Sequence, residues 1–196
     1  MWIKICGMTS EAAVVAALAA GADAVGFVFT DSVRRVTPER ARQLARPARG
    51  RVRCVAVTRH PAPALVAEIL AVFAPDVLQS DAADLRTLPL PSGLALLPVV
   101  RAGEAAPAQL PGRILFEGPV SGAGVPCDWQ AARALSARTQ LVLAGGLTRD
   151  NVAVAIRTAR PFGVDVSSGV EERPGVKSPH AINEFVAAVR AAEAVA

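Results

Sequence analysis

The sequence has few of the residues that would build a metal centre or a disulfide scaffold. Its 196 residues include three cysteines and two histidines. Cys6, Cys54 and Cys127 form no CxxC pair and no cluster with His60 or His180. An odd number of cysteines cannot all pair with one another, and this spacing offers no zinc-ligand set. The cysteine usage instead fits a protein of the reducing cytoplasm.

Long apolar runs are also missing. The longest stretches without a charge are Ala12–Ala22 and Thr87–Val100. Neither approaches the roughly 18 apolar residues of a membrane-spanning helix, and prolines interrupt the second. The N-terminal segment contains no apolar region of signal-peptide length. We therefore expect no membrane partner and no secretory leader.

Tyrosine is absent and only 4% of the residues are aromatic, which bears on nucleic-acid binding. The net charge of +4 rests almost entirely on arginine, because Lys4 and Lys177 are the only lysines. The densest basic stretch is Arg46, Arg49, Arg51 and Arg53, without interleaved aromatic residues. A nucleic-acid site usually combines more charge with stacking residues or a motif, so we interpret these arginines as solvated surface.

What the chain does contain is a regular alternation of two patterns. Short apolar runs with strand character span Trp2–Cys6, Ala24–Phe29, Val52–Val57, Val77–Gln79, Ala95–Val100, Ile114–Phe116, Leu141–Ala144 and Gly163–Ser167. Helical spacing occupies Ser10–Ala20, Thr37–Arg46, Pro61–Phe73, Asp128–Ala137, Arg149–Thr158 and Ser178–Ala194. Ser10 and Thr37 are suited to cap their helices, and Pro38 to the first helical position. The weakest helices are Asp81–Thr87 and Glu104–Leu110.

Eight strand signals, each followed by a helix or a poor substitute for one, predict a compact single (β/α)8 TIM barrel. The barrel would cover residues 1–196 as one domain, since no linker or low-complexity tract divides the chain. Its thinnest part, with degenerate helices, should lie between Gln79 and Leu115. An open doubly wound sheet is the alternative, but it normally has fewer strands, and no GxGxxG follows the first strand.

In such a barrel the active site forms at the C-terminal ends of the strands. Lys4 and Cys6 end the first strand, and alternation places them on one face. If that face is the interior, the lysine would lower the pKa of the thiol and make it a usable base or nucleophile. The alternative is that Cys6 is an inert core thiol.

Two later loops carry further candidates. Arg34 and Arg35 follow the second strand and could hold a carboxylate by a two-pronged contact. Glu117 ends the sixth strand, ahead of the glycine-rich loop Ser121–Gly124, and could serve as an acid or base. For both loops a solvated surface loop is the alternative interpretation.

The last two units predict a phosphate site. Gly145 and Gly146 follow the seventh strand, and Ser168 and Gly169 follow the eighth. Small residues there leave backbone N–H groups free to surround an anion, and a short helix would add its positive end. Loops seven and eight frequently bind phosphate in these barrels. Asp165, within the eighth strand, could point into the same pocket; the alternative is a structural carboxylate.

These residues resemble the phosphoribosylanthranilate isomerase family along the whole chain. The resemblance is carried by Lys4–Thr9, Gly21–Phe29, Ser32–Arg34, Leu143–Leu147, Asn151–Val152, Val164–Glu171 and Pro174–Lys177. It implies a (β/α)8 barrel that performs an Amadori rearrangement in tryptophan biosynthesis. The substrate would be N-(5-phosphoribosyl)anthranilate and the product 1-(o-carboxyphenylamino)-1-deoxyribulose 5-phosphate. The resemblance further implies no metal or organic cofactor, and a monomer or homodimer.

The resemblance also implies a role for each candidate. Cys6 would be the general base and Glu117 would stand at the position of the general acid. Lys4, Arg34 and Asp165 would contact the substrate, with Arg34 on the anthranilate carboxylate. The phosphate would bind at Gly145, Gly146, Ser168 and Gly169. The acid would have to stay protonated near neutral pH, so its pKa would have to be raised by burial or nearby negative charge.

Three positions depart from the family pattern. Glu117 stands where the family has aspartate, Asp81 where it has histidine, and Arg101 where a lysine is usual. The longer acid and the extra negative charge of Asp81 leave two alternatives open. One is a divergent paralogue that acts on another phosphorylated aminosugar. The other is a weakly catalytic binding subunit.

Overall fold

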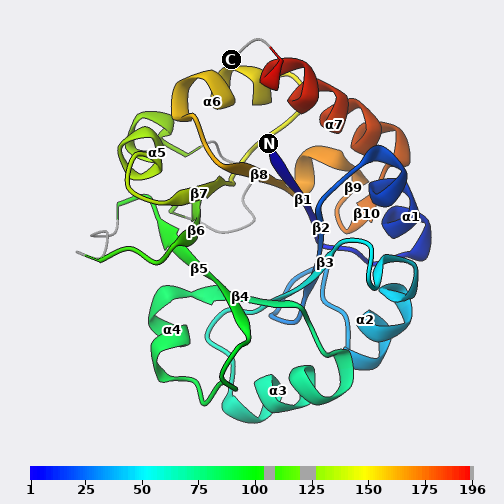
Figure 1. Ribbon diagram of the computed structural model, residues 1–196. Helices are drawn as coiled ribbons and strands as arrows, with labels where there is room; N and C mark the ends of the chain where they lie inside the picture. Colours follow the sequence, from blue (N-terminus) through cyan, green and yellow to red (C-terminus); the bar gives the residue numbers. More distant parts are fainter. Residues whose placement is uncertain (104–108, 120–126, 195–196) are drawn as a thin grey trace.

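The computed structural model describes residues 1–103, 109–119 and 127–194, and its centre is a closed barrel of parallel strands (Figure 1). The strands are β1 (Trp2–Cys6), β2 (Ala24–Val28), β3 (Arg53–Val57), β4 (Val77–Asp81), β5 (Ala95–Arg101), β6 (Arg113–Glu117), β7 (Gln140–Leu143) and β8 (Gly163–Val166). β8 pairs back onto β1, with Trp2 opposite Gly163. The predicted (β/α)8 barrel is confirmed, and the open-sheet alternative is wrong.

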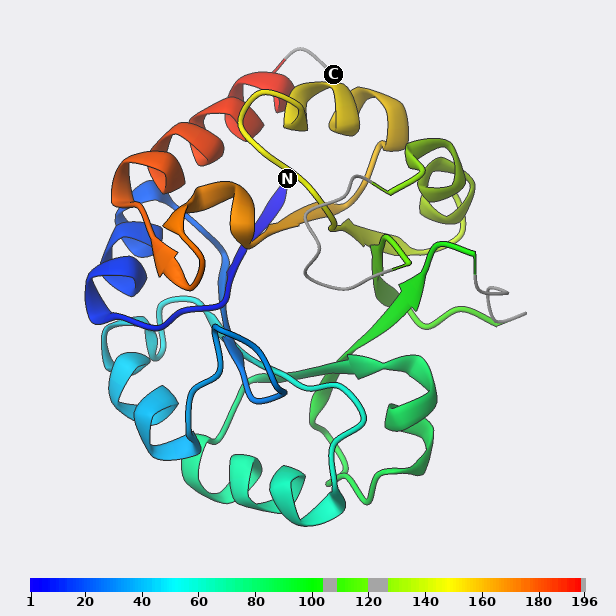
Figure 2. The same cartoon turned by 180° about the vertical axis from the view of Figure 1, so that it is seen from behind.

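Helices surround the barrel on the outside (Figures 1 and 2). They are α1 (Glu11–Ala20), α2 (Pro38–Leu44), η1 (Arg46–Ala48), α3 (Pro63–Glu68), η2 (Ile69–Phe73), α4 (Ala82–Thr87), α5 (Trp129–Ser136), α6 (Val152–Ala159) and α7 (Pro179–Glu193). The predicted caps are confirmed: Ser10 Oγ accepts from Ala13 N at 3.2 Å, and Thr37 Oγ1 accepts from Arg40 N at 3.1 Å. These bonds satisfy backbone N–H groups of the first turn, which have no partner within their helix.

The middle of the barrel has the thinnest cover, as the sequence predicts. α4 has six residues. Between β5 and β6 the described residues contain no helix, and most of the expected helix Glu104–Leu110 falls on residues 104–108, outside the described part. The expected glycine-rich loop Ser121–Gly124 also lies outside the described residues.

The alternation of side chains along the strands creates two apolar layers. Leu97, Leu115 and Val142 belong to a small cluster inside the barrel. Ile3 and Ile5 belong to the larger cluster between the barrel and its helices. Because successive strand residues point to opposite faces, Lys4 and Cys6 point into the barrel. The expectation that they share one face is therefore confirmed, and that face is the interior.

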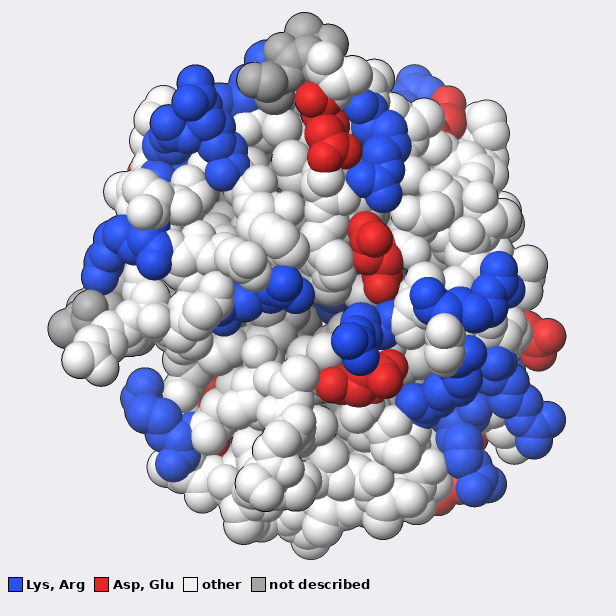
Figure 3. Space-filling model, viewed as in Figure 1, with Lys and Arg blue, Asp and Glu red and all other residues white. Residues whose placement is uncertain are grey.

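Arginines gather at the lower right of Figure 3, on the side where Figure 1 shows α2. Arg49 of the dense basic stretch has a structural task there. It donates to the backbone oxygens of Phe73 and Ala74, and its guanidinium lies 4.8 Å from the centre of the Phe73 ring. It therefore closes the end of η2 rather than remaining solvated surface. In the described part of the chain, no helix has the length and apolar character needed to span a bilayer.

The sequence analysis did not predict the short hairpin after β8. The chain forms η3 (Ser168–Val170), β9 (Glu171–Arg173) and β10 (Val176–Lys177). Strands of three and two residues are too short for a periodic pattern. Gly175 makes the turn at φ +82°, and its backbone oxygen accepts from Thr9 Oγ1 at 2.7 Å. In Figure 2 the hairpin, in orange, accordingly lies beside the segment between β1 and α1.

Candidate active site

A cavity of about 400 Å³ opens at the C-terminal ends of the strands. Nearly all of the residues that the sequence singled out line it. They are Cys6, Arg34, Gly145, Gly146, Glu117, Asp165 and Ser168. Lys4 and Gly169 lie behind this lining. The structure thus brings the predicted thiol, acid and loop glycines to one pocket.

Lys4 is fully buried below the cavity and pairs with Asp165. Its Nζ donates to Asp165 Oδ1 at 2.9 Å, which joins β1 to β8 inside the barrel. Burial alone would lower the pKa of Lys4, but the carboxylate of Asp165 and the Cys6 sulfur together raise it. Lys4 is therefore a cation that holds Asp165 at the floor of the cavity.

The loops after β7 and β8 are shaped by their glycines. Gly145 and Gly146 have φ angles of +89° and +62°, in the left-handed region that favours glycine. Asn151 fixes this turn, because its Nδ2 donates to Gly146 O at 2.8 Å and its Oδ1 accepts from Thr148 N at 2.8 Å. The backbone of the loops after β7 and β8, where η3 starts at Ser168, is suited to binding an anion.

Gly169 serves the contact between these two loops. A Cβ at this position would lie 2.0 Å from the backbone oxygen of Leu147, so no larger residue fits without movement of the backbone. The glycine lets the loop after β8 pack directly on the loop after β7. Its place is thus behind the predicted phosphate site, where it sets the spacing of the two loops.

Cys6 lines the cavity and is 7% exposed. Burial raises the pKa of its thiol, and Lys4 lowers it by less, while Asp165 raises it further. The net shift is upward, opposite to the shift expected from the sequence. The cation is present where the sequence placed it, but the loss of hydration and the neighbouring carboxylate outweigh it.

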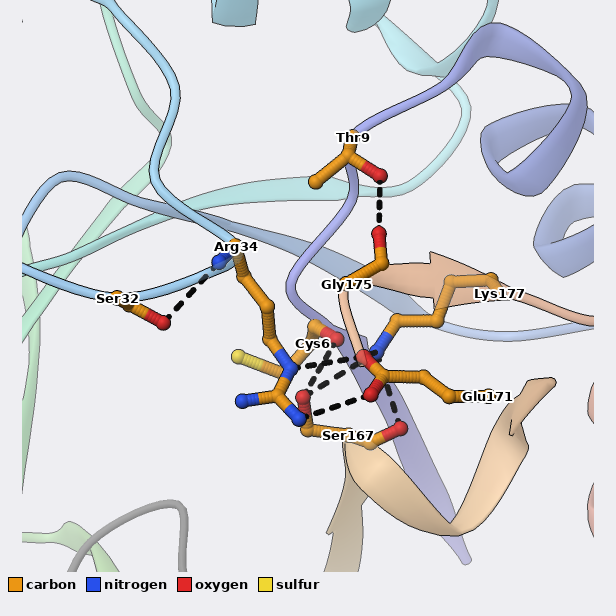
Figure 4. Close-up of polar contacts among 8 residues, drawn as sticks. All are labelled: Cys6, Thr9, Ser32, Arg34, Ser167, Glu171, Gly175 and Lys177. Carbon is orange, nitrogen blue, oxygen red and sulfur yellow. Dashed lines mark hydrogen bonds and ion pairs between the residues drawn. The ribbon is translucent and has the colours of Figure 1, made fainter. Parts of the chain in front are cut away.

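Arg34 reaches over the end of β1 and forms a two-pronged ion pair with Glu171 of the hairpin (Figure 4). Its Nε donates to Oε1 at 2.7 Å and its Nη2 to Oε2 at 2.8 Å. Gly7 makes room for this path, since a Cβ there would lie 2.6 Å from Arg34 Cδ. Figure 4 shows the third guanidinium nitrogen, Nη1, pointing away from Glu171.

Lys177 is a site residue to which the sequence analysis gave no role. Its Nζ is within 2.7 Å of Glu171 Oε1, and it donates to Ser167 O at 2.9 Å. Ser167 Oγ in turn donates to the backbone oxygen of Cys6 at 3.1 Å. The one available signal was that the chain has only two lysines, and that one of them stands in the matched motif Pro174–Lys177.

The ion pairs of Glu171 with Arg34 and Lys177 should make the unfolding free energy depend on pH in the acid range. Burial alone would raise the pKa of Glu171, but hydrogen bonds from Arg34 and Lys177 outweigh it and lower the pKa from 4.5 to about 2. A depressed pKa stabilises the folded state above pH 4.5, and this contribution is lost as the pH falls toward 2. It amounts to about 3 kcal/mol of unfolding free energy.

We therefore expect the unfolding free energies of wild type and Glu171→Gln to differ at pH 7 and to converge between about pH 5 and pH 2. Urea denaturation at a series of pH values measures both curves. Glu172→Gln, at the exposed neighbouring position, should follow wild type throughout. A wild type–Glu171→Gln difference that stays constant down to pH 2 would contradict the ion-pair account.

Glu117 ends β6 on the other side of the cavity and is held by Arg101. Arg101 lies opposite Glu117 in the β5–β6 register, and its Nη2 is 3.0 Å from Glu117 Oε1. The sequence analysis expected burial or nearby negative charge around this acid, and the structure places a guanidinium in contact with it.

Arg101 also contacts Asp81, the acid that stands where the family has histidine. Its Nη1 is 2.6 Å from Asp81 Oδ1, so the negative charge that departs from the family pattern is compensated within the site. His60 and Arg59 approach the same carboxylate at 3.5 and 3.8 Å. Asp81 is 7% exposed and lies behind the residues that line the cavity.

Among the described residues, one group could offer three ligands to a metal ion, namely His60, Asp81 and Asp84. His60 Nδ1 lies 3.0 Å from Asp84 Oδ1, so this ring nitrogen already has a partner. The guanidinium of Arg101 contacts Asp81. Because a cation already satisfies one of the three ligands, we assign no metal to this group.

Comparisons of the sequence and of the structure with known proteins indicate the same family. Residues 3–188 match the model of the family described as "N-(5'phosphoribosyl)anthranilate (PRA) isomerase". The chain is 40% identical to a protein of Rhodopseudomonas palustris (strain BisB18) named N-(5'-phosphoribosyl)anthranilate isomerase, and the match covers 97% of this chain and 96% of that protein.

Solved structures show the same likeness. The crystal structure of phosphoribosyl anthranilate isomerase from Thermus thermophilus has a TM-score of 0.84 at 29% identity, covering 97% of this chain and 99% of that one. A phosphoribosyl anthranilate isomerase in complex with reduced 1-(o-carboxyphenylamino)-1-deoxyribulose 5-phosphate has a TM-score of 0.80 at 28% identity, with the same coverage.

Proposed function

Because the chain belongs to the N-(5'-phosphoribosyl)anthranilate isomerase family, we propose that it isomerises N-(5-phosphoribosyl)anthranilate to 1-(o-carboxyphenylamino)-1-deoxyribulose 5-phosphate in tryptophan biosynthesis. The family match over nearly the whole chain carries this conclusion. The cavity supports it, because a thiol, a carboxyl group and an anion-binding edge surround one space. We further propose a cytoplasmic enzyme, since its three cysteines are free thiols.

The substrate carries a negative group at each end, and the site offers a place for each. The phosphate would bind at Gly145, Gly146 and Ser168, where backbone N–H groups are available. The anthranilate carboxylate would bind the Nη1/Nη2 edge of Arg34, because Glu171 occupies the Nε/Nη2 edge. Fixing both ends would hold the ribose between Cys6 and Glu117.

Ring opening would be the task of Glu117. The carboxyl group would donate its proton to the ribose ring oxygen, the bond from that oxygen to C1′ would break, and the anilino nitrogen would form a protonated Schiff base with C1′. Arg101 beside Glu117 would stabilise the carboxylate that remains after the proton has left.

Proton removal would be the task of Cys6. The thiolate would take the proton from C2′, and the released electron pair would form the C1′–C2′ double bond while the nitrogen regains its lone pair. The resulting enol gains a proton at C1′ and loses one from the C2′ hydroxyl to give the ketone. Water would supply the proton at C1′ and accept the one from the C2′ hydroxyl, and proton exchange with water would return Cys6 to the thiolate and Glu117 to the acid, so that the isomerisation balances.

The test is direct turnover by the purified protein. Anthranilate, phosphoribosyl pyrophosphate and an anthranilate phosphoribosyltransferase generate the substrate, and liquid chromatography separates the two isomers. We expect the ketose to form only when this protein is present. Absence of turnover with full substrate consumption in a parallel reaction with a known isomerase would refute the proposal. Turnover of a different phosphorylated aminosugar alone would favour the divergent-paralogue alternative.

A further inference from the structure

The cavity wall around Cys6 contains more charged groups than the proposed reaction uses. The groups on this wall are Lys4, Arg34, Lys177, Asp165 and Glu171. Those across the cavity are Asp31, Arg59, His60 and Glu117. Around the sulfur, three cations thus stand against two carboxylates. Asp165 pairs with Lys4, and Glu171 alone serves both Arg34 and Lys177.

Glu171 is built into the wall rather than into the cavity. Its side chain is 4% exposed. Glu171 is not among the described residues that line the cavity. Its carboxylate contacts three nitrogens, Arg34 Nε at 2.7 Å, Arg34 Nη2 at 2.8 Å and Lys177 Nζ at 2.7 Å. Glu171 therefore affects the charge in the cavity through Arg34 and Lys177, the two cations that it contacts.

Both cations lie close to Cys6. Arg34 passes over Gly7, the residue that follows β1, and it lines the same cavity as Cys6, with which it interacts electrostatically. Lys177 is tied through Ser167 to the backbone oxygen of Cys6, and it lowers the pKa of the thiol. Any change in the charge of this group should therefore change the ionisation of Cys6.

We propose that Glu171 is a positioning residue, which fixes the edge of Arg34 presented to the substrate and, by neutralising Arg34 and Lys177 in part, sets the pH at which Cys6 ionises. The inference rests on the proposed function in taking Cys6 as the base and Arg34 as the group that binds the carboxylate. Two carboxylates against three cations leave one positive charge, which the Cys6 thiolate would balance.

The experiment measures the rate of Cys6 alkylation by iodoacetamide as a function of pH, with mass spectrometry of the peptide that contains Cys6. Glu171→Gln keeps an acceptor oxygen for Arg34 and Lys177 but removes the negative charge. We expect the midpoint of its profile to fall by about one pH unit, which makes alkylation about tenfold faster at pH 7. Lys177→Met should move the midpoint upward by a similar amount.

Glu172→Gln is the matched control, since it makes the same change at the next, exposed residue and should leave the midpoint unchanged. In turnover, Glu171→Gln should raise KM roughly tenfold, because Arg34 loses a charge-assisted partner and its fixed orientation. The Glu172→Gln variant should keep the wild-type KM.

Alkylation needs no turnover, so it tests the inference even if the proposed reaction fails. A Glu171→Gln midpoint equal to that of Glu172→Gln, or above that of wild type, would overturn the inference. If Glu171→Gln does not fold, Lys177→Met decides the matter: an unchanged midpoint there would overturn it, and an upward shift would support it. Circular dichroism establishes which variants are folded.

Discussion

Replacing Cys6 with serine is expected to lower kcat by about 10² to 10⁴-fold, the usual contribution of a positioned general base. The serine hydroxyl occupies nearly the same space but does not ionise at any pH at which the protein is folded. KM should change little, because in the proposed reaction the side chain would meet the substrate at the proton that moves and not at either anionic end. Steady-state kinetics with the generated substrate measure both constants.

Cys54→Ser is the matched control for this result. Cys54 is a buried thiol on β3, and it belongs to the apolar layer between the barrel and its helices rather than to the cavity. The same substitution there should leave kcat within a few-fold of wild type, at a temperature where both variants are folded. Near-wild-type turnover of Cys6→Ser would remove Cys6 as the base.

The fold could be predicted because its signals are local. Each strand is a short apolar run, and helices begin at residues such as Ser10 and Thr37 whose side chains accept from their own first turn. Alternation along β1 then placed Lys4 and Cys6 on one face before any strand had been paired. These features need only neighbours in sequence, and a single chain displays them fully.

The hidden features of the site depend on contacts between distant residues. Arg34 and Glu171 are 137 positions apart, and their pairing requires a hairpin too short to leave a periodic pattern. The pairing of Arg101 with Glu117 depends on the register between β5 and β6. The sequence of each strand alone does not determine that register. Asp81 therefore looked like an added negative charge, although Arg101 compensates it.

The ionisation of Cys6 shows a second limit of sequence reasoning. The sequence correctly placed a lysine beside the thiol, and a lysine does lower the pKa of a thiol. The sign of the net shift depends on how deeply the sulfur is buried and on Asp165, which comes from the far end of the chain. Opposing effects can be summed only when the geometry is known.

Shortening Glu117 to aspartate, the residue that the family resemblance leads one to expect, should lower kcat about 100-fold. The substitution draws the carboxyl group back by about an ångström, and a misplacement of this size can cost that much in rate. It also removes the 3.0 Å contact with Arg101, which is fixed opposite Glu117 by the β5–β6 pairing and by its own contact with Asp81. Steady-state kinetics give kcat and KM, and KM should change less than kcat.

The kinetic result for Glu117→Asp distinguishes two explanations for the glutamate at this position. If Arg101 and Asp81 have adjusted the wall to a longer acid, aspartate falls short of the substrate and activity declines. If glutamate is instead a defect in an otherwise conventional site, Glu117→Asp would raise activity, and the adapted-pocket account would fail. Glu172→Asp makes the same change at an exposed position and should not alter kcat. The Arg101 contacts with Asp81 at 2.6 Å and with Glu117 at 3.0 Å favour the first result, because the shorter aspartate would not reach a guanidinium that Asp81 also holds.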